Sequence, residues 1–400
     1  MDIIAARLNR IKPSPSSMAS QRARELSAAG RDIVGLTAGE PDFDTPPNVC
    51  DAVVRAMAAS KTKYTDVGGT PELKAAIVEK FRRDNALTYA ANEVIVGTGG
   101  KQIIFNALMC TLEPGDEVIV PAPYWVSYPD IALLADGRPV VVACRPEDKF
   151  KLRAEALDRA ITPKTRWLVL NAPNNPSGAM YTRDELRGLA DVLLRNPHVW
   201  VLSDDIYEHI RYDGRNFFTI AQVEPALKAR TLTVNGVSKS YAMTGWRIGY
   251  GGAPAELIKA MTKLQSQSTS NPCSISQAAA QEALNGPQDL VAERARIFEA
   301  RRDKVVAAVN RIPGLACHAP EGAFYVYASC ADVISKKTPD GRILAGDADF
   351  VMYLLESQNL ALLQGEAYGL SPFVRISFAA SMGMLEEGCR RLRLACEALR

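Results

Sequence analysis

Two cations stand alone in a segment that otherwise carries no charge. Residues 231–255 read TLTVNGVSKSYAMTGWRIGYGGAPA, and Lys239 and Arg247 are the only charged side chains among them. A lysine in a partly desolvated pocket loses proton affinity and becomes an amine nucleophile, which suits a Schiff base with an aldehyde. An arginine eight positions later can hold a phosphate through its fixed fork of donors. The alternative is a surface loop with two ordinary cations.

Further polar groups follow short apolar stretches that have the composition of strands. Gly99, Gly100 and Lys101 lie where such a stretch meets a helical pattern, and backbone N–H groups at such a junction can cradle a phosphate. Glycine is common at these turns for other reasons. Asp204 ends another apolar stretch, where a carboxylate can keep a ring nitrogen protonated. Alternatively, Asp204 or Asp205 caps the element that follows.

Three more side chains have a chemical and a structural interpretation. Trp125, in PAPYW, can stack on a planar ring or belong to the core. Asn175 lies in NPSG, where it can donate to a ring hydroxyl or simply form a turn. Arg375 is flanked by apolar residues in FVRISF, and a half-buried arginine needs an anionic partner. That partner is either a substrate carboxylate, held by two hydrogen bonds, or a structural Asp or Glu.

The elements that must position these residues follow a repeated pattern up to about residue 290. Short, β-branched, non-alternating strands separated by helices predict a largely parallel sheet covered on both faces. Ligands bind at the carboxyl ends of the strands in such sheets, so the polar loops are expected to converge on one site. The predicted strands are Val94–Gly97, Glu117–Val120, Trp167–Leu170, Trp200–Leu202 and Thr231–Val234.

The pattern changes after about residue 290. The sequence here predicts a smaller α+β domain. Its strands, at Ala323–Tyr327 and Phe373–Phe378, alternate between apolar and polar residues and are expected to have one solvent-exposed face, and its helices lie near 291–309 and 384–399. The expected fold class is therefore α/β, with a large domain on a mostly parallel central sheet flanked by helices, plus the smaller domain. The expected division is an N-terminal arm at 1–15, the small domain at 16–45 and 291–400, and the large domain at 46–290.

Composition limits the function classes. The 400 residues are 47% hydrophobic and 23% charged with a net charge of +2, which is typical of a soluble globular protein and gives no support for nucleic acid or an anionic membrane. No secretory signal or membrane-spanning run is evident. The eight cysteines lack a CxxC pair and predict a reducing, cytoplasmic environment. The three histidines have no metal-ligand spacing, so no metal is expected.

A series of motifs runs along essentially the whole chain: GEPDFDTP at 39–46, YTDVGGTPELK at 64–74, PYW at 123–125, NNPSG at 174–178, SDDIYE at 203–208, SKSYAMTGWRIGY at 238–250 and VRISFA at 374–379. Their order and spacing resemble the class I aminotransferases, which are pyridoxal-phosphate enzymes of fold type I. KPS at 12–14, GEPDFDTP and GGKQ resemble the compact aspartate aminotransferase subgroup, some of whose members also accept prephenate.

The resemblance implies pyridoxal 5'-phosphate as cofactor and a role for each matching residue. Lys239 would be the catalytic residue, binding the cofactor covalently and later moving a proton. Asp204 would pair with the pyridine nitrogen, Tyr207 and Asn175 would contact the ring oxygen, and Trp125 would stack on the ring. The phosphate would be bound by Gly99, Gly100, Lys101, Ser238 and Arg247, and by Tyr64 of the neighbouring subunit, which implies a homodimer with shared active sites.

The same resemblance implies how substrate is bound. Arg375 would take the α-carboxylate with help from Gly39, beside Trp125 and Asn175. Lys101 and Ser14 are the subgroup's candidates for the second carboxylate, because the arginine that some aspartate enzymes use has no counterpart here.

Two positions depart from the family pattern. The usual NPTG is NPSG here, a mild change in a turn. Gly236 replaces the serine of one branch, so that phosphate contact is missing.

The implied activity is transfer of an amino group from an L-amino acid, expected to be aspartate, to a 2-oxo acid, expected to be 2-oxoglutarate, by a ping-pong mechanism. The alternatives are an aminotransferase for prephenate, aromatic or alanine-type substrates, and a lyase of the same fold. A transcriptional regulator with an aminotransferase-like domain would need a DNA-binding module, and the match already begins near residue 12. The expected partners are an amino acid, a 2-oxo acid and a second subunit, without nucleic acid, membrane or metal.

Overall fold

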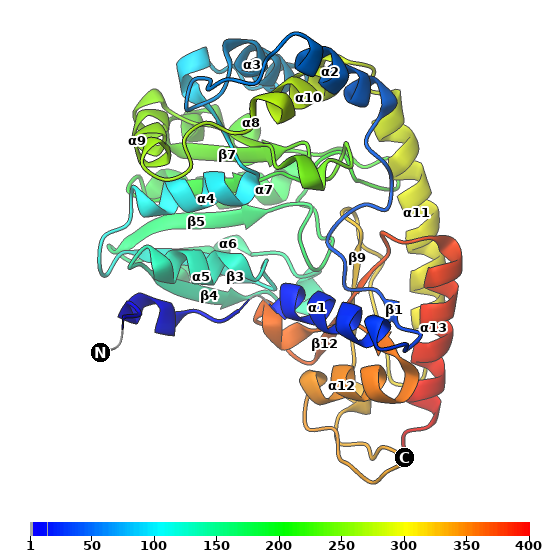
Figure 1. Ribbon diagram of the computed structural model, residues 1–400. Coiled ribbons are helices and arrows are strands. Elements are labelled where there is room, and N and C mark those ends of the chain that lie inside the picture. The colour runs from blue at the N-terminus through cyan, green and yellow to red at the C-terminus, as the bar shows by residue number, and fades with distance from the viewer. Residues whose placement is uncertain (1–2, 14) are drawn as a thin grey trace.

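The computed structural model describes residues 3–13 and 15–400. Figure 1 shows a large body built on one sheet, with a smaller body beside it. The large sheet has seven strands, and all neighbouring pairs are parallel except those that involve β8. In spatial order the strands are β2 (Val94–Gly97), β8 (Gly249–Gly252), β7 (Thr231–Gly236), β6 (Trp200–Asp204), β5 (Thr165–Asn171), β3 (Glu117–Ala122) and β4 (Arg138–Ala143).

Both faces of this sheet are covered by helices. Side chains of one strand alternate between two cores: Trp167 and Val169 pack with α4, α5 and α9, whereas Leu168 and Leu170 pack with α6 and α7. The helices of the large body are α2 (Pro47–Ala58), α3 (Pro71–Asn85), α4 (Gly100–Met109), α5 (Ser127–Leu134), α6 (Ala154–Ala160), α7 (Arg183–Arg195), α8 (Ile220–Val223), α9 (Ala255–Ser266) and α10 (Ser274–Asn285).

Strands β4 and β8 were not among the predicted strands. Strand β8 reads GYGG and lacks the β-branched residues that indicate a strand. Its glycines are required by close packing, because a Cβ on Gly252 would lie 2.6 Å from the Tyr89 ring and one on Gly251 would lie 2.8 Å from Ile103. Strand β4 lies at the sheet edge and is only partly buried.

The smaller body joins the N-terminal and C-terminal parts of the chain. Strand β1 pairs in parallel with β10, and Val34 and Leu36 belong to a core formed mainly by residues beyond 297. A second, antiparallel sheet has the order β11-β12-β9. The elements are α1 (Pro15–Ala28), β1 (Val34–Gly35), α11 (Asp289–Val309), β9 (Tyr325–Ser329), α12 (Asp347–Gln358), β10 (Leu360–Ala361), β11 (Leu363–Gln364), β12 (Phe373–Ser377) and α13 (Met382–Glu397).

The expectation of one wet face on the strands of the small body is wrong. Strand β12 is buried throughout and β9 nearly so. One side carries the core shared with α11, α12 and α13, while Tyr327 and Phe373 on the same strands pack against Phe150 of the large body. Burial on both sides explains why Arg375 is enclosed rather than half-exposed.

The predicted fold class is confirmed: the protein is α/β, with a mostly parallel central sheet and a smaller α+β part. The domain boundaries after residues 15, 45 and 290 stay a prediction. Helix α11 begins at Asp289 and runs beside both bodies (Figure 1). Short 3-10 turns occur at Ala6–Arg10, Ala91–Glu93, Pro146–Asp148, Pro225–Arg230, Thr244–Trp246, Ala331–Val333 and Gly365–Tyr368.

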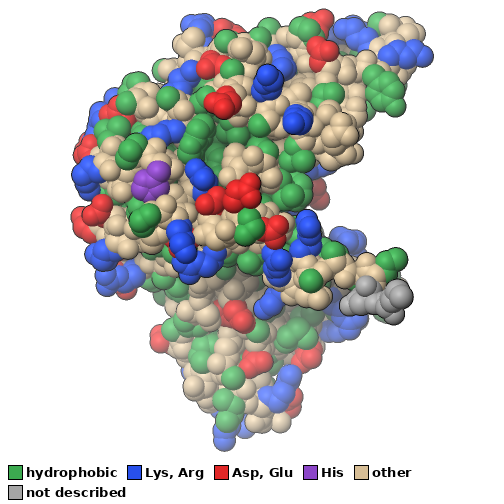
Figure 2. All heavy atoms as spheres, turned by 90° about the vertical axis from the view of Figure 1, so that its left-hand side faces the viewer, with side chains coloured by type: hydrophobic (Ala, Val, Ile, Leu, Met, Phe, Trp, Pro, Cys, Tyr) green, Lys and Arg blue, Asp and Glu red, His purple; other side chains and the backbone are tan. Residues whose placement is uncertain are grey.

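The surface carries charges of both signs. Figure 2 shows Lys and Arg side chains interspersed with Asp and Glu on one face of the molecule. Among the helices of residues 3–13 and 15–400, none combines the length and the apolar character needed to cross a membrane.

Candidate active site

A cavity of about 270 Å³ lies at the carboxyl ends of the central strands and is completed by the small body. The large body contributes the residues that follow β2, β3, β5, β6 and β7, as expected for an open parallel sheet. The small body contributes Gly39, Tyr325 and Arg375. The complete lining is Gly39, Gly100, Lys101, Ile104, Trp125, Tyr128, Asn171, Asn175, Asp204, Ile206, Tyr207, Ser238, Lys239, Arg247, Tyr325 and Arg375.

Lys239 reaches this cavity from the turn that follows β7. Its Nζ donates a hydrogen bond of 2.7 Å to the carbonyl oxygen of Gly39. Burial, reinforced by the nearby charge of Arg247, lowers the pKa of Lys239 to about 8. An amine with this pKa is deprotonated often enough near neutral pH to act as a nucleophile or a base.

Asp204 ends β6 and is buried beside the cavity. Its Oδ2 accepts a hydrogen bond of 2.6 Å from the Tyr128 hydroxyl, and its Oδ1 accepts a long one of 3.4 Å from the Ile206 amide. Burial raises the pKa of Asp204 to about 6, and the Tyr128 hydrogen bond opposes this rise. Asp205 does not line the cavity, and its Oδ1 accepts from the Ser203 hydroxyl at 2.7 Å.

The junction of β2 with α4 forms a cradle of backbone donors. Gly100 and Lys101 open α4, so their N–H groups have no partner within the helix. Gly99 has a φ of 87°, and a Cβ there would lie 2.2 Å from a terminal nitrogen of Arg247. A Cβ on Gly249 would lie 2.1 Å from the Gly100 amide nitrogen. The two glycines therefore allow the Arg247 guanidinium to lie beside the start of α4. A guanidinium and free backbone N–H groups close together can bind a phosphate.

Arg375 presents a buried guanidinium to the same cavity. It is 2% exposed, and it donates to Asn175 Oδ1 at 3.1 Å and to the carbonyl oxygen of Thr37 at 2.6 Å. Its Nε has no hydrogen-bond partner, and within the described residues no Asp or Glu forms an ion pair with it. The alternative raised by the sequence, a structural Asp or Glu as the partner of Arg375, is therefore not found in the part of the chain that the structure describes. A buried cation with a spare donor fits an anionic ligand.

Aromatic side chains line the space between these charges. The Tyr207 hydroxyl lies 2.9 Å from that of Tyr325, whose ring faces the Arg375 guanidinium at 4.4 Å. Lys101 Nζ lies 4.9 Å from the centre of the Trp125 ring. Burial, with the charge of Arg247 adding to it, lowers the pKa of Lys101.

The structure brings most of the predicted site residues together, but not all of them. Ser238 lines the cavity, and Gly99 borders it through Arg247. Tyr64 is 92% exposed and lies outside this cavity. Ser14 lies outside the described residues.

Five lining residues were not predicted from the sequence: the apolar Ile104 and Ile206, and the polar Tyr128, Asn171 and Tyr325. Asn171 ends β5 just as Asp204 ends β6, so its position after a strand was a usable signal. Tyr128 follows Trp125 at helical spacing, but nothing in the sequence connects it with Asp204. Tyr325 lies in a segment that was predicted to be a strand, but no side chain of that strand was assigned to the site.

Comparison with known proteins agrees with this geometry. Residues 31–392 match the family described as "Aminotransferase class I and II". The chain belongs to this family. The predicted family and the predicted transaminase activity are thereby confirmed.

The relatives of this aminotransferase match it over nearly its full length. It is 55% identical over 398 residues to a probable aspartate/prephenate aminotransferase of Rhizobium leguminosarum bv. phaseoli, covering 100% of both chains. The solved aspartate aminotransferase of Rhizobium meliloti superposes with a TM-score of 0.97 at 55% identity, covering 99% of each chain. That of Thermus thermophilus, solved with maleate, gives a TM-score of 0.92 at 41% identity, covering 99% of this chain and 100% of the other.

Proposed function

We propose that this aminotransferase uses pyridoxal 5'-phosphate to move the amino group of L-aspartate to a 2-oxo acid, with 2-oxoglutarate as the expected acceptor. The observation that carries the proposal is the shared cavity. A buried arginine with a spare donor, a lysine with a lowered pKa and a buried carboxylate all face the same space. A half-reaction on an amino acid needs these three groups together.

The residues of the cavity fit the cofactor. The start of α4 and Arg247 offer donors for its phosphate, Asp204 offers a carboxylate for its ring nitrogen, and Trp125 offers an aromatic face. Tyr207 and Asn175 offer polar groups for the ring oxygen. When bound, pyridoxal phosphate supplies an aldehyde that reacts with amines and a protonated ring that withdraws electrons from the substrate's α carbon.

The side chains of the protein would then divide the work. Lys239 Nζ supplies the amine that binds the cofactor, and it moves a proton at the α carbon of the substrate. Asp204 keeps a proton on the ring nitrogen, because a buried carboxylate stabilises a cation beside it. Tyr128 fixes the orientation of Asp204 through its hydrogen bond. Arg375 orients the substrate through its α-carboxylate.

The aspartate assignment depends on a second cation in the cavity. Lys101 is the candidate, because its side chain lines the cavity beside Trp125. The Thermus thermophilus relative was solved with maleate, a dicarboxylate, which supports a site for two carboxylates. Ser14 remains a proposed helper. The other interpretation is that Lys101 serves only the cofactor's phosphate.

The substrate proposal is tested by Lys101→Ala. A hydrogen bond to a charged group contributes about 1.5–3 kcal/mol, so kcat/KM for aspartate should fall roughly 10- to 100-fold, while alanine and phenylalanine are turned over as before. Lys228→Ala is the matched control, because Lys228 also lies over an aromatic ring, 4.6 Å from that of Tyr89, but outside the cavity. Equal losses on acidic and neutral substrates would show that Lys101 serves the cofactor instead.

Prephenate is the second candidate acceptor, favoured by the name of the Rhizobium leguminosarum relative. The purified enzyme, loaded with cofactor, would be mixed with each amino donor, and the cofactor's visible absorption band followed through one turnover. Restoration of the band by prephenate after reaction with aspartate would establish the second activity. Failure of every amino acid to change the band would contradict the whole proposal.

The proposal includes a homodimer with shared sites in the cytoplasm. Tyr64 supports the dimer, because an exposed tyrosine outside its own cavity is free to reach the phosphate of a neighbour. The cytoplasmic location rests on the eight cysteines, all of which are free thiols.

A further inference from the structure

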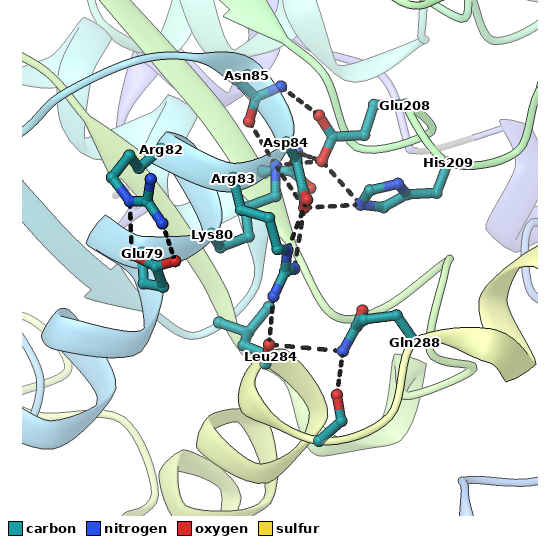
Figure 3. A network of polar contacts seen from close by, with 12 residues as sticks. Glu79, Lys80, Arg82, Arg83, Asp84, Asn85, Glu208, His209, Leu284 and Gln288 are labelled. Carbon is teal, nitrogen blue, oxygen red and sulfur yellow. Dashed lines mark hydrogen bonds and ion pairs between the residues drawn. The ribbon is translucent and has the colours of Figure 1, made fainter.

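Figure 3 shows a buried ion pair and its polar neighbours, none of which lines the active-site cavity. Lys80 is 1% exposed and Glu208 is 2% exposed, and their charged groups are in direct contact. Removing two charges from water costs several kcal/mol for each ion, and their attraction offsets this cost only when the geometry is good.

The polar neighbours of the pair satisfy it almost completely. Glu208 Oε1 accepts a hydrogen bond of 2.8 Å from the amide of Asn235, and Oε2 accepts one of 2.6 Å from that of Asn85. Lys80 Nζ also donates to Asn85 Oδ1 at 2.7 Å. The pair and the two amides therefore form one closed network that leaves little freedom to any member.

Two more charged side chains cover the outer side of this network. His209 Nε2 lies 3.2 Å from Glu208 Oε1 and 3.4 Å from Asp84 Oδ2. Asp84, Glu208 and His209 could together hold a metal ion, but the ammonium of Lys80 already contacts Glu208 and lies 4.0 Å from Asp84 Oδ2. Because a lysine of the chain supplies the cation, the network is a closed structural unit and needs no ion.

The network connects three elements of the large body. Lys80 and Asn85 belong to α3, Glu208 lies in the turn after β6, and Asn235 belongs to β7. Asn235 also donates to the carbonyl oxygen of Asp205 at 3.2 Å.

Two of these elements also carry residues of the active site. Glu208 directly follows Tyr207 and lies four residues after Asp204. Strand β7 ends at Gly236, three residues before Lys239. The hydrogen bond from Asn235 to Glu208 therefore links the two segments that carry the proposed cofactor-binding residues.

We propose that Lys80 and Glu208 are positioning residues of the active site, which hold Asp204, at the end of β6, and Tyr207, in the turn that follows, at a fixed place relative to Lys239. This inference rests on the proposed function, because only a bound cofactor requires the two segments to keep one geometry. Stability alone does not explain the pair, since apolar or neutral replacements of a buried ion pair are often as stable. A reacting group displaced by about 1 Å can lose roughly 100-fold in rate.

The test is the double variant Lys80→Met/Glu208→Gln, which removes both charges and leaves no unpaired ion. The matched control is Lys151→Met/Glu185→Gln, because Lys151 and Glu185 form an ion pair in the large body, 9% and 34% exposed, away from the cavity. For each protein one would measure the melting temperature, the equilibrium dissociation constant of pyridoxal phosphate from the apoenzyme, and kcat and KM for aspartate.

The double variant should melt near the temperature of the parent protein, yet bind pyridoxal phosphate about 10-fold more weakly and show a kcat lower by about 10-fold or more. The KM for aspartate should change little, because Arg375 is not part of the network. The control should keep the parent's kcat and cofactor affinity. A double variant with parental kcat and affinity would overturn the inference, as would an equal loss in the control.

A second variant covers the case in which the double variant does not fold. Asn235→Ala keeps the ion pair but cuts its connection to β7, and it should lower kcat and cofactor affinity in the same direction. Parental values for Asn235→Ala would contradict the positioning role. Failure of the proposed function can be told apart from failure of the positioning role. In the first case the unmodified protein itself would bind no pyridoxal phosphate, which would overturn both the proposed function and this inference.

Discussion

At the scale of single residues, the environment of Lys239 sets its chemistry. A burial-lowered pKa of about 8 and a hydrogen bond to the Gly39 carbonyl oxygen place an available amine in the cavity. Borohydride reduction of the cofactor-loaded enzyme should therefore attach a pyridoxyl group to Lys239, detectable by peptide mass mapping. Lys239→Ala should still bind cofactor without a covalent bond but lose turnover. A label on Lys101 instead would contradict the assignment.

The two adjacent carboxylates at the end of β6 have different surroundings. Asp204 lines the cavity and is oriented by Tyr128. Asp205 is buried outside the cavity and contacts the Ser203 hydroxyl. Asp204→Asn should lower kcat by about 100-fold or more, the usual cost of removing a preorganised electrostatic contact. Asp205→Asn should cost much less, because burial and the charge of Glu208 already raise the pKa of Asp205 to about 7. Steady-state kinetics that show the reverse order would mean that Asp205 serves the ring nitrogen.

At the scale of elements, α3 and the turn after β6 are joined by charges that depend on pH. Burial lowers the pKa of His209, but the nearby carboxylates of Glu208 and Asp84 outweigh this and raise it above its ordinary value. Lys80, from α3, opposes the protonated form.

Because the folded pKa is raised, the stability contributed by protonated His209 is fully present below the unfolded pKa of about 6.5 and is lost as the pH rises through the folded pKa. The difference in melting temperature between the parent and His209→Gln should therefore be largest near about pH 6 and shrink toward about pH 9. His198→Gln is the control, since its Nε2 contacts the Thr162 carbonyl oxygen at 3.0 Å rather than a carboxylate. A difference that stays constant with pH would rule out this charge contribution.

At the scale of the whole molecule, the proposed dimer makes a complementation experiment possible. Lys239→Ala and Tyr64→Phe would each impair every site of their own homodimer. In a hybrid, one site would contain both changes and the other neither, so about one site in four is native when the subunits mix at random. Mixed and re-equilibrated subunits should therefore regain activity that neither variant has alone. Sedimentation of the parent as a fully active monomer would defeat the shared-site proposal.

Much of the fold was predictable because the signals are local. Buried parallel strands have continuous apolar runs, and the start of α3 carries a local signal too, with Thr70 as its cap and Pro71 in its first turn. Strand β8 was missed, because its glycines are required by close contact with Tyr89 and Ile103, which are far away in the sequence. The strands of the small body were expected to have a wet face, but contact with the large body buries them.

The sequence by itself determined the family and suggested the chemistry: an isolated lysine, a carboxylate at a strand end, a glycine-rich helix start and an arginine among apolar residues are each compatible with a role in the site, and the family resemblance makes those roles specific. Only the tertiary structure decided what surrounds them. Lys239 meets Gly39 and Arg375 meets Asn175 across 200 residues of sequence, and Tyr128 and Lys80 reach their carboxylates from other elements. Such contacts depend on how the packed elements place their side chains, and no local pattern encodes that placement.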